Sequence, residues 1–116
     1  MRHILHLRKE PFQKISSGHK TIELRLYDKK RQKIAVGDVL CFILEDQADR
    51  TLTARVTALH RFKSFEELYA SLPLDKCGYN DETIKSASWH DMEQYYPLEI
   101  QKHYGVVGIE FELEAE

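Results

Sequence analysis

Residues 18–28 have the sequence Gly18-His19-Lys20-Thr21-Ile22-Glu23-Leu24-Arg25-Leu26-Tyr27-Asp28, and they carry the clearest structural pattern in the chain. The segment begins as a turn at Gly18 and then alternates apolar and polar residues, which predicts a strand over residues 21–27. Successive side chains of a strand point to opposite faces. One face therefore carries Ile22, Leu24 and Leu26, and the other carries Thr21, Glu23, Arg25 and Tyr27.

The polar face of this strand has two interpretations. The Glu23 carboxylate and the Arg25 guanidinium stand two residues apart, roughly 7 Å along one side of a strand, and the Lys20 ammonium precedes them in the turn. A row of charges on a rigid element is typical of a binding site. The alternative is a structural ion-pair cluster on an exposed sheet face, which is common and contributes little stability.

Length and composition indicate one soluble globular domain over residues 1–116. The 31% charged and 42% hydrophobic residues are ordinary for a folded protein and exclude a disordered chain. No apolar run approaches the roughly 18 residues of a membrane span, and the first residues lack the apolar core of a signal peptide. We therefore expect a cytoplasmic protein without a membrane partner. Cys41 and Cys77 show no CxxC spacing, so we expect no disulfide.

Charge is distributed unevenly along the chain. Residues 1–33 contain ten Lys and Arg against three Asp and Glu, a net +7, whereas the remainder has seven against sixteen, a net −9. The basic segment can present a positive patch to phosphate, or its charges can pair with the acidic remainder across the folded protein. The candidate members of the patch are Arg8, Lys9, Lys14, Lys20, Arg25, Lys29, Lys30, Arg31 and Lys33.

The periodicities predict an α+β fold in which a small mixed β-barrel of about five strands has short helices inserted between them. Strands are expected over residues 3–7, 21–27, 39–44, 51–59 and 106–113. Residues 45–50 are expected to form a polar hairpin loop. Four helices are expected: one with Pro11 in its first turn, one that starts at the capping box of Ser64 and Glu67, one capped by Ser88, and one that Pro97 opens and Gly105 ends. The inner face of the fourth strand is expected to carry Leu52, Ala54, Val56 and Ala58.

The spacing Gly18-x-Lys20-x-x-Glu23-x-Arg25, followed by Gly37-Asp38, resembles the ASCH domain family, named for activating-signal-cointegrator homology. The Pro-Phe helix before the motif and the ending Tyr104-Gly105-Val106-Val107-Gly108-Ile109-Glu110 are also similar to small bacterial members. The resemblance implies a β-barrel related to the PUA domain, with a cleft that binds RNA or a nucleotide.

The same resemblance implies a second activity. Some small bacterial relatives are amidohydrolases that remove the acetyl group from N4-acetylcytidine with a lysine of this motif, a threonine three residues later and a distant glutamate. Lys20 matches the lysine, and Glu23 stands at the threonine position. Lys20 and Glu23 are thus the candidate catalytic residues. By position alone, the candidates for the distant glutamate are Glu66, Glu67 and Glu93.

As a binding site, the motif offers complementary groups. Arg25 presents a planar fork of donors suited to phosphate or a base edge, and Lys20 supplies a point charge. Glu23 accepts from an exocyclic amine or holds Arg25 in place. The loop with Lys29, Lys30 and Arg31 would follow phosphates beside the cleft.

Aromatic side chains can stack on a base, and Tyr79, in a glycine-containing turn, is the candidate for an exposed one. Tyr95, Tyr96 and Trp89 have the same capability but are expected to lie in the core. The six histidines show no zinc spacing, so we expect no metal site and no cofactor. A third interpretation is an interaction domain whose acidic part meets a protein partner.

Overall fold

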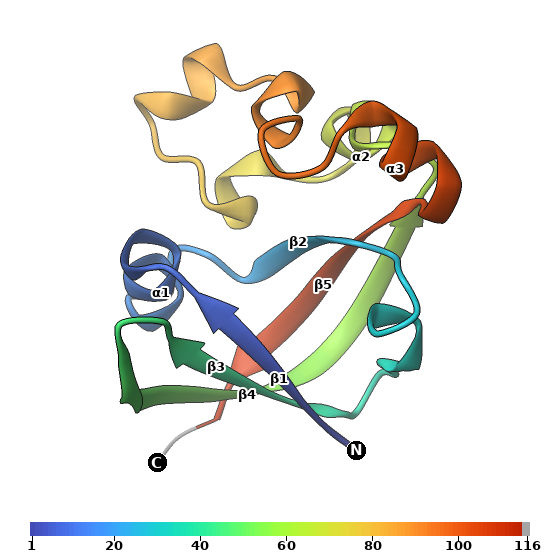
Figure 1. The fold of residues 1–116 in the computed structure, drawn as a ribbon. Coiled ribbons are helices and arrows are strands. Elements are labelled where there is room, and N and C mark those ends of the chain that lie inside the picture. The colour runs from blue at the N-terminus through green and yellow to red at the C-terminus, as the bar shows by residue number, and fades with distance from the viewer. Residues whose placement is uncertain (115–116) are drawn as a thin grey trace.

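The strands of the computed structural model, which describes residues 1–114, form one mixed sheet in the order β1-β3-β4-β5-β2. β1 pairs with β3 in parallel, and all other neighbours are antiparallel. The sheet curls so that β1 and β2 are its two edges (Figure 1). The strands are β1 (Arg2–Leu7), β2 (Ile22–Leu26), β3 (Val39–Leu44), β4 (Gln47–Phe62) and β5 (Val106–Leu113).

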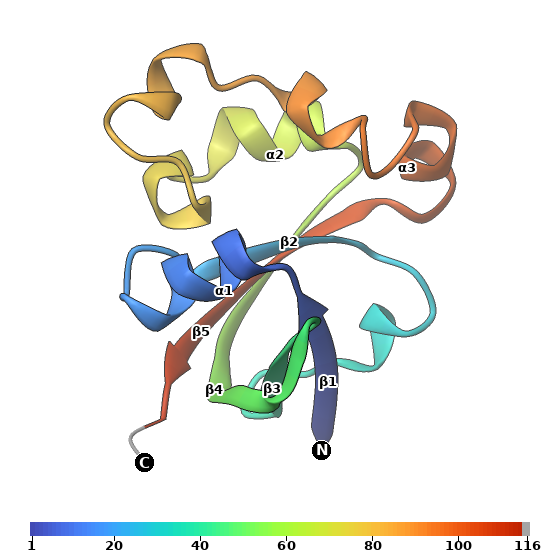
Figure 2. The ribbon, with the colours of Figure 1, turned by 60° about the vertical axis from the view of Figure 1, so that its left-hand side comes forward.

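The helices are short, and most of them lie between β4 and β5. Together with the turns between them, α2 to α3 (residues 65–104) form a layer above β2, which we call the helical layer (Figures 1 and 2). None of the helices in residues 1–114 is long and apolar enough to cross a membrane. The helices are α1 (Lys9–Ser16), α2 (Phe65–Ser71) and α3 (Leu98–Tyr104), with 3-10 turns η1 (Arg31–Lys33), η2 (Leu74–Cys77), η3 (Thr83–Ser86) and η4 (Trp89–Met92).

Two separate cores stabilise this arrangement. The first fills the concave side of the curled sheet and includes Phe42, Val56 and Ile109, with Phe12 and Ile15 of α1 packed on it. The second lies between β2, β5 and the helical layer. The fold prediction is therefore confirmed: five strands form a mixed half-barrel of α+β class, consistent with the PUA-like architecture.

The two-faced pattern of β2 is confirmed, and the structure shows what each face contacts. Ile22 and Leu24 are buried against Phe65 and Leu68 of the helical layer. The opposite face is not exposed, because Glu23 retains only 4% of its accessible surface. An exposed ion-pair cluster is thus the wrong description of this strand.

Three sequence predictions are wrong in detail. The hairpin after β3 turns at Glu45 and Asp46 alone, because β4 already begins at Gln47. Ala58 does not continue the inner face, since a bulge between Val56 and Ala58 inserts a residue and brings Leu59 against the core instead. The helix expected after Ser88 is only the 3-10 turn η4, although its capping box is present.

Gln101 ties the helical layer together. Its side chain is fully buried in α3, and its Oε1 accepts a hydrogen bond from Phe65 N at 3.1 Å. Its Nε2 donates to Tyr96 O at 2.8 Å. One amide therefore satisfies the first turn of α2 and the segment that precedes α3, two places where a buried backbone group would otherwise lack a partner.

We predict that Gln101→Ala lowers the free energy of unfolding by about 3 kcal/mol, because it leaves two backbone groups unsatisfied. Gln13→Ala, on the exposed face of α1, is the control and should change stability little. Urea denaturation followed by circular dichroism measures both variants. Equal stability of the two variants would contradict the role of Gln101.

Candidate functional site

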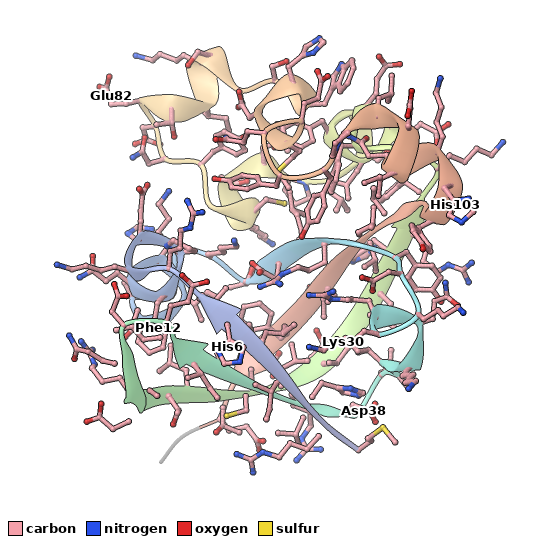
Figure 3. The ribbon with its side chains drawn as sticks, in the orientation of Figure 1. His6, Phe12, Lys30, Asp38, Glu82 and His103 are labelled. Carbon is pink, nitrogen blue, oxygen red and sulfur yellow. The ribbon has the colours of Figure 1, made fainter. Side chains whose placement is uncertain are left out.

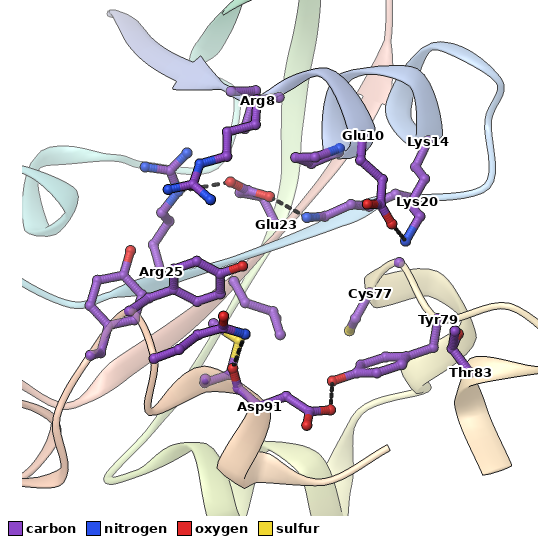
Figure 4. A pocket seen from close by; sticks show the side chains of 18 of the residues that line it. Arg8, Glu10, Lys14, Lys20, Glu23, Arg25, Cys77, Tyr79, Thr83 and Asp91 are labelled. Carbon is purple, nitrogen blue, oxygen red and sulfur yellow. Dashed lines mark hydrogen bonds and ion pairs between the residues drawn. The ribbon is translucent and has the colours of Figure 1, made fainter. Parts of the chain in front are cut away.

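A cavity of about 850 Å³ lies between β2 and α1 on one side and the helical layer on the other (Figure 4). Here the side chains of the sheet and α1 do not pack directly against those of the helical layer. Its size suits one small organic ligand. The lining residues that carry the chemistry are Arg8, Lys14, Lys20, Glu23, Arg25, Tyr69, Cys77, Tyr79, Asp91, Tyr95 and Tyr96.

The turn that presents Lys20 is fixed by backbone bonds. Gly18 has a φ of +85°, a left-handed conformation that favours glycine. Lys20 N then donates to Lys14 O at the end of α1, at 3.0 Å, and Thr21 N donates to Lys76 O of the helical layer, at 2.9 Å. These bonds place Lys20 where β2, α1 and the helical layer meet.

Lys20, Glu23 and Arg25 form one buried cluster at the base of the cavity. The Lys20 Nζ lies 2.6 Å from Glu23 Oε1, and Arg25 Nε donates to Glu23 Oε2 at 2.7 Å. The two cationic side chains are only 12% and 14% exposed. Arg25 Nη2 also donates to His6 O of β1 at 3.2 Å, so this guanidinium bridges the two edges of the curled sheet.

The Glu23 carboxylate stays ionised. Burial by itself raises the pKa of Glu23, but the charges of Lys20 and Arg25 outweigh burial and hold the pKa below its usual value. Lys20 Nζ contacts Oε1 and Arg25 Nε donates to Oε2, so each carboxylate oxygen has its own cationic partner. Glu23 therefore holds both cations at the base of the cavity.

The ion pairs show how the basic segment is compensated. Lys14 pairs with Glu10 at 3.1 Å, and Arg31 pairs with Asp28 at 3.0 Å. Together with the Glu23 pairs, these contacts use the three acids of residues 1–33. Among the described residues, the lysine and arginine ion pairs of this segment are thus formed within the segment, whereas Met1 N and His3 contact Asp38 of the acidic remainder.

The wall opposite the motif carries a chain of hydroxyl groups. The Tyr69 and Tyr79 oxygens are 2.6 Å apart, and Tyr79 donates to Asp91 Oδ2 at 2.7 Å. Burial raises the pKa of Tyr69 to about 12 and raises the pKa of Tyr79 further, so both stay protonated. Because an ionised carboxylate only accepts, Tyr79 donates to Asp91 and Tyr69 donates to Tyr79. This wall thus offers acceptors to a ligand.

Tyr79 lines the cavity, but it is not the exposed aromatic residue that the sequence predicts. It is half-buried, since its ring packs edge-on against Tyr69 and its hydroxyl is engaged. Tyr95, at 52% exposure, is the exposed aromatic residue of the cavity. The nearby Cys77 is no nucleophile at neutral pH, because burial raises the pKa of its thiol to about 12.

The basic loop does not belong to the cavity. Lys29, Lys30 and Arg31 are absent from its lining, and in Figure 3 Lys30 lies below β2, on the side away from the segment that carries Glu82. Arg31 is held by Asp28. These three side chains therefore do not line the cavity, and a role for the loop in binding phosphate stays a prediction.

The three candidates for the distant glutamate lie outside the cavity. Glu66, Glu67 and Glu93 do not line it, whereas Glu10, Glu45 and Asp91 do. Arg8, a candidate member of the basic patch, lines the cavity, whereas Asp91 was not predicted because it belongs to no motif and reaches the cavity only through the fold. Within the described chain, no group of three or more His, Cys, Asp or Glu could hold a metal ion.

The charges that line the cavity balance. Four are cationic and four are carboxylates, so its formal charge is zero at neutral pH with histidine neutral. The positive rim that the sequence predicts is thus compensated within the cavity itself. The charged residues are Arg8, Lys14, Lys20 and Arg25 against Glu10, Glu23, Glu45 and Asp91.

We predict that Glu23→Gln lowers the free energy of unfolding by about 3 kcal/mol, because it leaves two buried cations without their counter-charge. Glu10→Gln removes a solvent-exposed pair with Lys14 and is the matched control, expected to have little effect. Chemical denaturation at neutral pH measures both variants. A Glu23→Gln variant as stable as Glu10→Gln would contradict the prediction.

We predict that acid removes the contribution of the Glu23 ion pairs to the free energy of unfolding in the wild-type protein. The pKa of Glu23 is lower in the folded protein than its ordinary value of 4.5, so its ion pairs stabilise the fold above that value and are lost as the pH falls through the folded pKa. A hydrogen bond with His3 holds the pKa of Asp38 at about 2, which adds a second loss in the same direction. Glu23→Gln should therefore lose less stability than wild type between neutral pH and the acid range.

Comparison with known proteins identifies solved structures with a similar fold. The protein resembles the hypothetical protein PH0355, seen in a crystal structure, at 31% identity and a TM-score of 0.80 over 98% of this chain and 100% of that one. It resembles protein PF0455 from Pyrococcus furiosus, solved by NMR, at 33% identity and a TM-score of 0.74 over the whole of both chains.

More distant similarity is confined to the fold. A mutant of the ZmASCH protein from Zymomonas mobilis shares 12% identity and a TM-score of 0.65, with 96% of this chain and 69% of that one covered. The curated proteins contain no match. The ASCH domain family matches residues 5–115. The chain belongs to the ASCH domain family.

Proposed function

We propose that this protein binds a nucleoside unit, either as a free nucleoside or nucleotide or as one residue of single-stranded RNA, in the cavity built on Lys20, Glu23 and Arg25. The observation that carries the proposal is the buried charged cluster of Lys20, Glu23 and Arg25, which lines a cavity of a size that suits one small ligand. Hydrogen bonds from a ligand to charged groups are stronger in such a poorly hydrated place than in water.

The two walls of the cavity suit the edges of a base and its sugar. Lys20 and Arg25 offer donors on the β2 side, and Asp91 with the tyrosine hydroxyls offers acceptors on the other side. Nucleosides carry both kinds of group, and their rings have the apolar faces that the tyrosines of the cavity can contact. The balanced charge favours a neutral nucleoside over a polyanion.

We predict that purified protein binds ribonucleosides and their 5′-monophosphates in calorimetry, with affinities that change less than about threefold between roughly 50 and 200 mM salt. Lys20→Met keeps the aliphatic stem but removes the ammonium, and should weaken binding by about tenfold. The double variant Lys29→Ala/Lys30→Ala, outside the cavity, is the control and should bind as wild type does.

Fluorescence anisotropy with a short labelled single-stranded RNA extends the measurement to RNA. Competition of free nucleosides with the RNA would support one shared cavity. Absence of binding to every nucleoside and RNA tested would overturn the proposal, as would Lys20→Met binding that equals wild type.

Hydrolysis of an acylated nucleoside is the second candidate. The observation in its favour is that the Lys20 and Arg25 cations converge on one carboxylate at the base of the cavity, with little exposure to water. An amide carbonyl placed there would meet two cationic donors, which stabilise an oxyanion when water attacks. Glu23, being ionised, holds the lysine beside that carbonyl, and the proton that the attacking water loses passes to the amine of the leaving nucleoside.

The two candidates are separated by one incubation. If the protein is an amidohydrolase, N4-acetylcytidine yields cytidine and acetate in the presence of wild type, and Lys20→Met abolishes the release. If N4-acetylcytidine binds but is recovered unchanged by chromatography, the enzymatic candidate fails and the binding function stands.

A further inference from the structure

Arg8 is the cavity cation with no counter-charge. Lys14, Lys20 and Arg25 each lie within 3.1 Å of a carboxylate oxygen. The guanidinium of Arg8, in contrast, has neither an ion-pair nor a hydrogen-bond partner among residues 1–114, and the side chain is exposed at the start of α1. Arg8 is thus available to a ligand in a way that the motif cations are not.

Tyr95 stands on the opposite wall. It follows η4 in the helical layer, and at 52% exposure it leaves much of its ring uncovered. The guanidinium carbon of Arg8 lies 6.0 Å from the centre of the Tyr95 ring. Two planar groups from opposite walls therefore face each other across the cavity, one of them cationic and one aromatic.

The spacing is close to that of a slot for a flat ring. A planar ring between two planar groups needs about 3.5 Å on each side, or about 7 Å in total. The present separation is shorter by about one ångström, and Arg8, which no side-chain bond restrains, is able to move outward by that amount. A sugar ring is not flat and cannot use both faces in this way.

Building on the proposed function, we infer that the base of the bound nucleoside stacks between the Arg8 guanidinium and the Tyr95 ring. The base thereby gains a cation–π contact on one face and an aromatic contact on the other. This arrangement selects planar aromatic ligands, because Arg8 and Tyr95 contact the two faces of the base. Glu23 and Asp91 can then bind the polar groups at the edges of the base.

The test is an NMR titration of the protein with adenosine, and with ribose as the ligand that lacks a base. We expect adenosine to shift the Tyr95 ring resonances upfield, as stacking requires, and ribose to leave them unchanged. Arg8→Ala and Tyr95→Ala should each weaken adenosine binding by about tenfold. Tyr95→Phe keeps the ring and should bind as wild type does.

Tyr104→Ala is the matched control, because Tyr104 is an exposed tyrosine outside the cavity. It should bind adenosine with wild-type affinity. If adenosine binds wild type and both alanine variants equally, the stacking inference is wrong and the proposed function survives. If adenosine binds neither wild type nor any variant, the stacking inference is overturned, whereas the proposed function is overturned only if the other nucleosides and the RNA also fail to bind.

Discussion

The Glu23 carboxylate, held between Lys20 and Arg25, is the interaction on which the rest of the site depends. A carboxylate with 4% exposure would cost a great deal of stability if it were unpaired, so both cations must lie against it. Lys20 belongs to the turn after α1, and Arg25 donates also to the edge strand β1 through His6 O. One carboxylate thus couples the turn, β2 and the opposite edge of the sheet.

The cavity follows from how the sheet is covered. The half-barrel has two open edges, β1 and β2. The aliphatic face of β2 points away from the first core, so a second layer must cover it. The helical layer supplies that cover through Phe65 and Leu68. It contacts the motif turn through the bond between Thr21 N and Lys76 O, and between that contact and the second core the layers stay apart. Ligand sites commonly form where two layers meet in this way.

The charge distribution of the sequence and the charge of the cavity are different quantities. The basic first third uses its three acids for its own ion pairs, and Lys29 and Lys30 stay exposed outside the cavity. The acidic remainder contributes Asp91 and Glu45 to the lining. The formal charge of the cavity lining is therefore balanced: all four cations lie on the side of α1 and β2, where Glu10, Glu23 and Glu45 offset three of them, and Asp91 of the helical layer supplies the fourth carboxylate. Polarity of this kind orients a neutral ligand more than it attracts an anion.

The sequence by itself determined the local features. Strand periodicity located β2 and its two faces and placed Glu23 and Arg25 on the same face. Lys20 precedes them in the turn, where backbone bonds to α1 and the helical layer position it. The glycine turn and the family motif followed from the same few residues. These features depend on neighbours in sequence, and a pattern of residue types is enough to express them.

Only the tertiary structure decided which other side chains join the motif. Residues 74–96 form short 3-10 turns, which have no sustained hydrophobic periodicity. The sequence pattern therefore does not predict that Tyr79, Asp91 and Tyr95 form the cavity wall opposite the motif. The bulge that exchanges Ala58 for Leu59 is likewise set by pairing with β5. Arg8 and Tyr95 face each other although 86 residues separate them in sequence. Such contacts arise from packing between layers, and a one-dimensional pattern does not carry that information.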